Sequence, residues 1–89
     1  MPELKGAARD ADAICFGLIL KRHRVQRGWT LQQLGRASGL TPTFLGVMER
    51  GGNSPSLQTL LRLAEVFQID ATEIVREIVQ NREQFRRRV

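Results

Sequence analysis

Two short stretches on either side of Gly39 constrain the fold of this 89-residue chain more than any other feature. The first, LQQLGRAS, follows Thr30, and the second, PTFLGVMER, follows Thr41. Threonine is a good N-cap, and the proline that opens the second stretch suits the first helical position. Gly39 tolerates the positive φ that a sharp turn requires. The sequence therefore predicts two short helices, residues 31–38 and 42–50, joined by a tight turn.

Small and apolar residues in these two stretches stand in the register of a helix-turn-helix. Such a motif needs a small residue where its two helices cross, and Gly35 supplies it. It also needs inward-facing apolar residues, and these are Leu34, Leu40, Leu45 and Met48. Each position alone is a weak indication. All of them in register over residues 31–50 indicate a helix-turn-helix.

The rest of the chain also carries helical patterns. Asp12 is a candidate N-cap for a first helix that Gly28 would stop. Ser56 would cap a helix whose 3.6-residue apolar period is kept by Leu57, Leu60, Leu61, Ala64 and Phe67. Asp70 and Glu73 form a capping pattern before a last helix, ATEIVREIVQNREQF. We expect an all-α chain of five helices, divided into a flexible arm (1–11), a helix-turn-helix domain (12–80), and the end of the last helix with a basic tail (81–89).

The charge balance narrows the class of function. Fourteen Lys and Arg against nine Asp and Glu give a formal net charge of +5, which fits a nucleic-acid partner. Cys15 is the only cysteine and His23 the only histidine. We therefore expect no internal disulfide, no metal or other cofactor, and no enzyme. No apolar run reaches the ~20 residues of a membrane span and no signal peptide opens the chain, so a cytoplasmic protein without membrane contact or an evident small-molecule ligand is expected.

Three segments resemble the phage-repressor and Cro-like family, also called the Xre type. They are RVQRGWTLQQLGRASGLT, FLGVMERG and NSPSLQTLLRLAEVFQIDATEI, and the resemblance runs from about Phe16 to Val75. It implies a five-helix Cro/C1-repressor-like domain that usually binds double-stranded DNA as a dimer. The helix from about Pro42 to Arg50 would lie in the major groove. The last helix is extended, because it runs beyond the family's usual end.

The resemblance also implies an ion pair between Arg24 and Glu49. In the family, an arginine of the first helix bonds the glutamate that ends the recognition helix. A partly buried bidentate pair would fix this helix against its support. The alternative is two solvated charges. We favour the pair because Glu49 is the only acid between residues 13 and 64, and an unpaired carboxylate facing phosphates would weaken binding.

Contacts to the DNA backbone are expected on both flanks of the recognition helix. The first turn of the preceding helix offers free N–H groups at a positive dipole end. The residues matching the family's backbone contacts are Thr30, Leu31, Gln32 and Gln33 on one flank, and Arg50, Ser54 and Ser56 on the other.

Contacts to bases are where the chain departs from the family's pattern. Family members commonly carry Gln, Arg, Asn or Ser on the groove face, whereas this chain has Leu31, Pro42, Thr43, Gly46 and Val47 there. Only Thr43 can hydrogen-bond a base, and Val47 could contact a thymine methyl. Phe44 is expected in the core rather than on the DNA backbone. The base-contact candidates are Thr43, Val47, Pro42 and, beyond the helix, Asn53.

Apolar residues of the last helix suggest self-association. Five of them recur along one side, more than one small protomer can cover: Ile74, Val75, Ile78, Val79 and Phe85. The alternative is that the helix folds back over its own core through Ile74 and Ile78. Leu18 and Val25 form a second, smaller stripe on the first helix.

The resulting hypothesis is a sequence-specific transcriptional regulator, such as a repressor, that binds a near-palindromic operator as a homodimer. Its two recognition helices would enter successive major grooves about 34 Å apart. The competing hypothesis is an antitoxin or protein-interaction module whose helix-turn-helix packs on a partner protein instead of reading DNA.

Overall fold

Five α-helices make up the residues that the structure, a computed structural model, describes, which are 7–88. They are α1 (Ala7–Gln26), α2 (Leu31–Ser38), α3 (Pro42–Glu49), α4 (Leu57–Phe67) and α5 (Ala71–Arg88). No strand occurs in this part of the chain. The expected all-α, five-helix fold is confirmed. None of these helices is long and apolar enough to cross a membrane.

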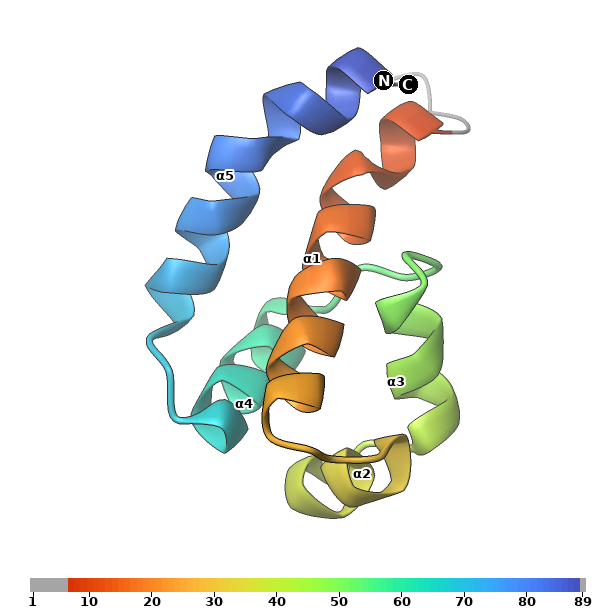
Figure 1. Cartoon of the computed structure of the whole chain (residues 1–89), viewed down its shortest axis with the longest axis vertical. Coiled ribbons are helices and arrows are strands. Elements are labelled where there is room, and N and C mark those ends of the chain that lie inside the picture. The colour runs from red at the N-terminus through yellow and green to blue at the C-terminus, as the bar shows by residue number, and fades with distance from the viewer. Residues whose placement is uncertain (1–6, 89) are drawn as a thin grey trace.

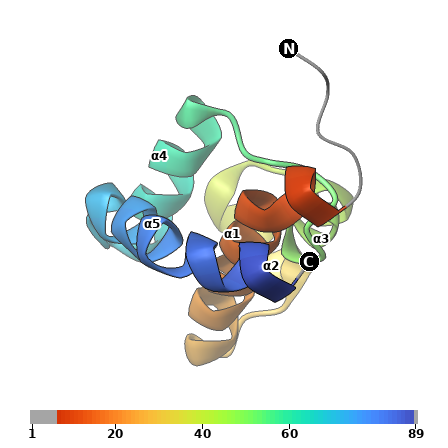
Figure 2. The ribbon, with the colours of Figure 1, turned by 90° about the horizontal axis from the view of Figure 1, so that it is seen from above.

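Helix α1 lies between α5 on one side and α3 on the other (Figure 1). It runs antiparallel to α5, and the two pack along their length. Helix α2 crosses near the C-terminal end of α1, and α4 contacts both α2 and α5 (Figure 2). Helix α3, the second helix of the helix-turn-helix, therefore packs against α1 along one side and against α2 at its start.

The first helix starts earlier than the sequence pattern indicates. It begins at Ala7, so the expected N-cap at Asp12 is wrong and residues 7–11, assigned to the arm, are helical. Ala11 and Ala13 are buried, and the Asp12 carboxylate pairs with Nη2 of Arg82 in α5 at 2.7 Å. This turn of α1 lacks large apolar side chains, so its helical period is weak. Its contacts with α5 are ones that only the tertiary structure reveals.

The N-cap of α2 and the turn between α2 and α3 have the hydrogen bonds and the positive φ angle that the sequence predicts. The Thr30 hydroxyl accepts from the Gln33 N–H at 3.1 Å, and the Gln33 side-chain oxygen accepts from the Thr30 N–H at 2.8 Å. Gly39 has φ of 77°, and its N–H donates to the Gly35 carbonyl at 2.8 Å. A Cβ at Gly35 would stand 2.8 Å from the Leu40 carbonyl oxygen, so the crossing admits no larger residue. The turn at Gly39 and the close crossing at Gly35 thus fix the position of α3 relative to α2.

The core contains the apolar residues expected of the helix-turn-helix. Leu34, Leu45 and Met48 are fully buried, and Leu40 and Phe44 pack against them. Helix α4, however, buries a narrower stripe than its period suggests. Leu60, Leu63, Ala64 and Phe67 face the core, while Leu57 and Leu61 are 71% and 50% exposed. The apolar period that includes Leu57 and Leu61 therefore extends beyond the side of α4 that packs on the core of the described residues.

Helix α5 folds back over the core of its own protomer. Ile74 is buried among the core residues and Ile78 packs against them. The alternative, in which the last helix folds back over its own core through these two residues, therefore describes the structure. The assignment of Ile74 to a dimer surface is therefore corrected. Val75 and Val79 remain exposed. The side chain of Phe85 lies outside the described residues.

Candidate nucleic-acid interface

An ion pair joins the supporting helix α1 to the end of α3. Nε of Arg24 donates to Oε2 of Glu49 at 2.6 Å, and Nη2 donates to Oε1 at 3.1 Å. The two side chains are only 14% and 7% exposed. The remaining Nη1 donates to the carbonyl of Trp29 at 2.7 Å. Hydrogen bonding to the carboxylate raises the pKa of Arg24 above its usual value, so the cation is held in place. One guanidinium thus ties α3 to both α1 and the turn that leads into α2.

Two glycines bring α3 close to α1. A Cβ at Gly17 would run into the carbonyl oxygen of Met48 and lie 2.7 Å from that of Glu49. Gly51 ends the helix with φ of 78°, and a Cβ there would stand 2.8 Å from Cγ1 of Ile14. Its N–H donates to the Met48 carbonyl at 3.0 Å. The backbones of α1 and of the end of α3 therefore lie in close contact. This contact explains why the ERG motif ends in a glycine, Gly51, and it holds α3 firmly against α1.

The outward side of α3 forms a shallow depression with the start of α2. Its volume is about 340 Å³, and its lining residues are Leu31, Gln32, Pro42, Thr43, Gly46 and Arg50. Thr43, Gln32 and Arg50 are exposed there. The N–H groups of Leu31 and Gln32 in the first turn of α2 have no intrahelical partner, so they add donors and a positive dipole end, whereas the Gln33 N–H donates to the Thr30 hydroxyl. Candidate base contacts and candidate phosphate contacts from the sequence thus meet on one surface.

Two of the base-contact candidates stand apart from this depression. Val47 is half-buried, and a Cβ at Gly52 would lie 2.9 Å from its Cγ1, so the loop after α3 covers part of it. Asn53 is exposed in that loop. Thr43 and Pro42 are therefore the candidates that the fold presents together.

Several phosphate candidates also serve as helix caps. Thr30 and Gln33 bond each other's backbone, as described above, which leaves the Thr30 hydroxyl hydrogen and the Gln33 amide group available as donors. The Ser56 hydroxyl accepts from the Thr59 N–H at 3.0 Å and lies 3.0 Å from the Thr59 hydroxyl. Ser54 is exposed beside it. The caps fix where these polar groups stand.

Comparison with known proteins identifies the family to which this chain belongs. The sequence profile of the helix-turn-helix family HTH_3 matches residues 20–74, which is more than half of the chain. The chain belongs to the HTH_3 family. This is the Xre/Cro-C1 type of DNA-binding transcriptional regulator and not an enzyme family.

Curated HTH_3 relatives share this region. The chain is 44% identical over 45 residues to the HTH-type transcriptional regulator SutR of Escherichia coli, covering 51% of the chain and 25% of SutR. It is 30% identical over 60 residues to SlrR of Bacillus subtilis, covering 66% of the chain and 40% of SlrR. The chain thus spans less than half of either protein. A third regulator, YazB of B. subtilis, is 30% identical over 63 residues, covering 71% of the chain and 91% of YazB.

Solved structures of similar proteins have the same fold. The restriction-modification controller protein C.AhdI of Aeromonas hydrophila is 34% identical, with a TM-score of 0.68, over 72% of this chain and 97% of C.AhdI. The clp gene regulator ClgR of Corynebacterium glutamicum has a TM-score of 0.70 at 24% identity, over 79% of this chain and 91% of ClgR. At that identity ClgR supports the fold alone. The five-helix arrangement is therefore that of Cro/C1-type HTH_3 domains.

Two features of this HTH_3 chain were missed by sequence reasoning. Gly17 was not recognised as a contact point between α1 and α3, because a lone glycine in a helix has no local signature. The 3.6-residue period of α4 did not distinguish Leu57 and Leu61, which are exposed, from the residues that face the core. The apolar stripe on α4 is wide, because it holds both residues besides four buried ones, and this width was the signal that part of the stripe lies outside the core.

Proposed function

We propose that this chain is a sequence-specific regulator that binds a near-palindromic operator as a homodimer, with α3 in the major groove. The observation that carries the proposal is the depression between α2 and α3, where Thr43 and Gln32 stand beside free N–H groups of a helix N-terminus. Such N–H groups bind phosphate oxygens, and side chains on the adjoining helix face reach base edges. Thr43, Pro42, Val47 and Asn53 would contact bases, and the phosphate contacts would come from Thr30, Leu31, Gln32, Gln33, Ser54 and Ser56.

The alternative of a protein-interaction module loses its main support. It drew on the apolar composition of α3. Leu45 and Met48 are buried in the protomer's own core, and Phe44 packs against that core. The outward side offers Pro42, Thr43, Gly46, Arg50 and a half-buried Val47, so the large apolar side chains of α3 are not available there for packing on a partner.

Binding to the DNA upstream of the protein's own reading frame tests sequence specificity. At a stated salt concentration and over a nonspecific competitor, we expect a retarded complex at least about 1000-fold tighter than that with a scrambled duplex. Footprinting should show two protected half-sites about 10 base pairs apart, centre to centre. Equal affinity for every duplex would contradict sequence-specific binding, and no binding to any duplex would favour the interaction module.

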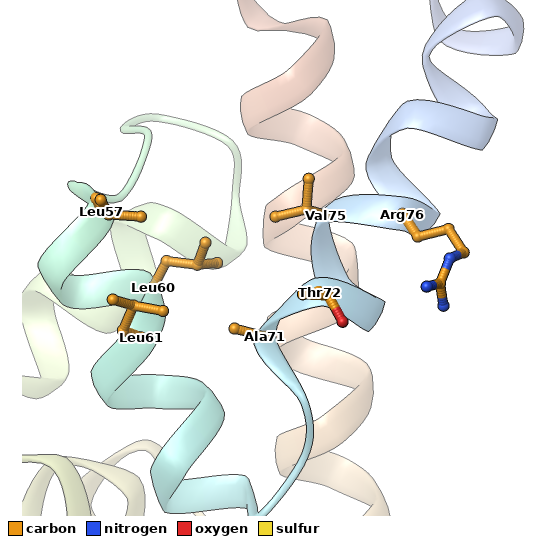
Figure 3. A pocket seen from close by; sticks show the side chains of 7 residues that line it. All are labelled: Leu57, Leu60, Leu61, Ala71, Thr72, Val75 and Arg76. Carbon is orange, nitrogen blue, oxygen red and sulfur yellow. The ribbon is translucent and has the colours of Figure 1, made fainter.

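The exposed apolar residues of α4 and α5 support self-association. Leu57 and Leu61 of α4 and Val75 and Val79 of α5 are exposed, and we call these four residues the α4–α5 face. An apolar groove of about 450 Å³ runs between the two helices, with Leu57 and Leu61 on one side and Val75 on the other (Figure 3). Leu60, Ala71, Thr72 and Arg76 form the rest of its lining, with the Arg76 side chain extending along the outer side of α5 (Figure 3).

A second copy of the chain is the partner that this surface suits. A two-fold axis would set the same face of each protomer against the other, so leucines of one copy could enter the groove of its partner. A domain this small buries a modest fraction of its own surface, so burying four further apolar side chains would add to its stability. The homodimer also matches the expected symmetry of the operator.

Replacing Leu61 by glutamate is expected to dissociate the dimer. A carboxylate brought into an apolar interface loses its hydration without gaining a partner, so the dissociation constant should rise at least about 100-fold. Sedimentation equilibrium of the purified protein measures the change. Val25→Glu is the matched control, because Val25 is also about half exposed, at 56%, but lies on α1. A dimer that survives Leu61→Glu and dissociates with Val25→Glu would place the interface on α1 instead.

A further inference from the structure

The guanidinium of Arg50 lies across the outward side of α3. A Cβ at Gly46 would stand 3.3 Å from Nη1 of Arg50 and 4.0 Å from its Cζ. The same position is 3.5 Å from Cδ1 of Leu31 in α2. Side chains at the end of a helix lean back toward its N-terminus. Because Gly46 has no side chain, the arm of Arg50 lies flat over the helix backbone, one turn back.

This path brings Arg50 to the surface where bases would be read. Thr43, Gly46 and Arg50 are spaced at i, i+3 and i+7, so they share one face of the helix. All three line the depression together with Gln32. The sequence places Arg50 with Ser54 and Ser56 on the flank, as a phosphate contact. The geometry instead directs its guanidinium along the groove face.

The guanidinium also has its donors available. Among the residues whose side chains the structure describes (11–82 and 84), the ion pairs join Arg22, Arg24 and Arg82 to acids, and none of them involves Arg50. The neighbouring carboxylate of Glu49 is occupied by Arg24 and almost buried. Arg50 therefore carries an uncompensated positive charge and a planar fork of N–H donors on a face otherwise poor in hydrogen-bonding side chains.

We propose that Arg50 is the main base-reading side chain of this protein and that it recognises guanine. A guanidinium fork donates to the O6 and N7 acceptors of guanine in the major groove, an arrangement that no other base presents. The glycine at position 46 gives it room to lie along the helix. The inference rests on the proposed function, because it requires α3 to enter the major groove of DNA.

Selection from a pool of randomised duplexes tests this role. The wild-type protein should enrich a motif with one invariant guanine in each half-site. Arg50→Lys keeps the positive charge and loses the fork. It should therefore select the same motif with a weaker preference for guanine at that position, because lysine can donate to the same acceptors but without the planar fork, and its affinity for the wild-type motif should fall by up to roughly 150-fold. Its affinity for a scrambled duplex and the salt dependence of that affinity should be unchanged, because the charge remains. Arg50→Met, which has no donor, should select the motif with that position degenerate.

The control is Arg36→Lys, the same exchange at an exposed arginine on α2 outside the depression. It should leave every position of the motif intact. If Arg50→Met still selects the intact motif, or if Arg50→Lys weakens selected and scrambled duplexes alike, Arg50 is a backbone contact and the inference is overturned while the sequence-specific function stands. A wild-type protein that enriches no motif overturns both.

Discussion

Replacing Glu49 by alanine is expected to lower the free energy of unfolding by about 3 kcal/mol. The substitution leaves the Arg24 guanidinium, which is only 14% exposed, without its carboxylate partner. Breaking a desolvated pair strands a charge, and water reaches this site only in part. Urea denaturation followed by circular dichroism measures the change. Because this pair connects α1 to α3, its removal should loosen the attachment of α3, the helix that would carry the DNA contacts.

A surface ion pair of similar geometry provides the control. Nη1 and Nη2 of Arg22 donate to the Glu77 carboxylate at 2.6 and 2.8 Å, but the two side chains are 45% and 33% exposed. Glu77→Ala should therefore cost no more than about 1 kcal/mol. The Arg24→Ala/Glu49→Ala double variant should lose less than the sum of its single variants, since removing both partners strands neither. Similar losses for Glu49→Ala and Glu77→Ala would mean that burial does not set the strength of the Arg24 pair.

Replacing Gly17 by alanine is expected to destabilise the fold by about 2 to 3 kcal/mol. Alanine is the better helix former, so α1 by itself would gain. Its Cβ, however, would meet the main-chain carbonyl oxygens of Met48 and Glu49, which cannot rotate away as a side chain could. Helices α1 and α3 would have to separate, and core contacts would be lost. The shift of the urea midpoint reports the size of the effect.

Gly46→Ala is the matched control for Gly17→Ala, because both glycines lie within helices. A Cβ at Gly46 meets only the end of the Arg50 side chain and Leu31, so the neighbours can give way. Gly46→Ala should leave stability unchanged or raise it by up to about 1 kcal/mol. If both alanines had the same effect, close packing of α1 on α3 would not be what requires glycine at position 17.

The helix-turn-helix was predictable because its determinants are local. The Thr30 cap, the Thr41 cap and the turn at Gly39 each depend on hydrogen bonds or dihedral angles within a few residues. Such signals can be read from a single sequence. The Arg24–Glu49 pair has no such local signal, because its partners are 25 positions apart. It was expected from the family resemblance, and the structure places the two side chains in contact.

The apolar residues of α4 and α5 show what a periodic pattern leaves open. The pattern on the last helix marked Ile74, Val75, Ile78 and Val79 among the candidates for self-association, with burial of Ile74 and Ile78 in the chain's own core as the alternative. Packing against α1 and α4 buries Ile74 and leaves Val75 outside. The same applies to Leu61 on α4. Which apolar residues remain exposed depends on how much of the surface of each helix is covered by its neighbours. The period of the apolar residues in the sequence gives no information on that covered area.

The sequence by itself determined the five-helix class, the capped pair of helices around Gly39 and the basic character of the chain. The tertiary structure alone decided where α1 begins, which leucines remain exposed, and how closely α1 approaches α3 at Gly17. It also decided the path of Arg50. The position of Arg50 in the sequence assigns it to the flank of α3, but the missing side chain at Gly46 lets its guanidinium lie on the outward face of that helix. The physical reason is range: caps and turns act over three or four residues, whereas burial and the direction of a long side chain depend on elements brought together by the fold.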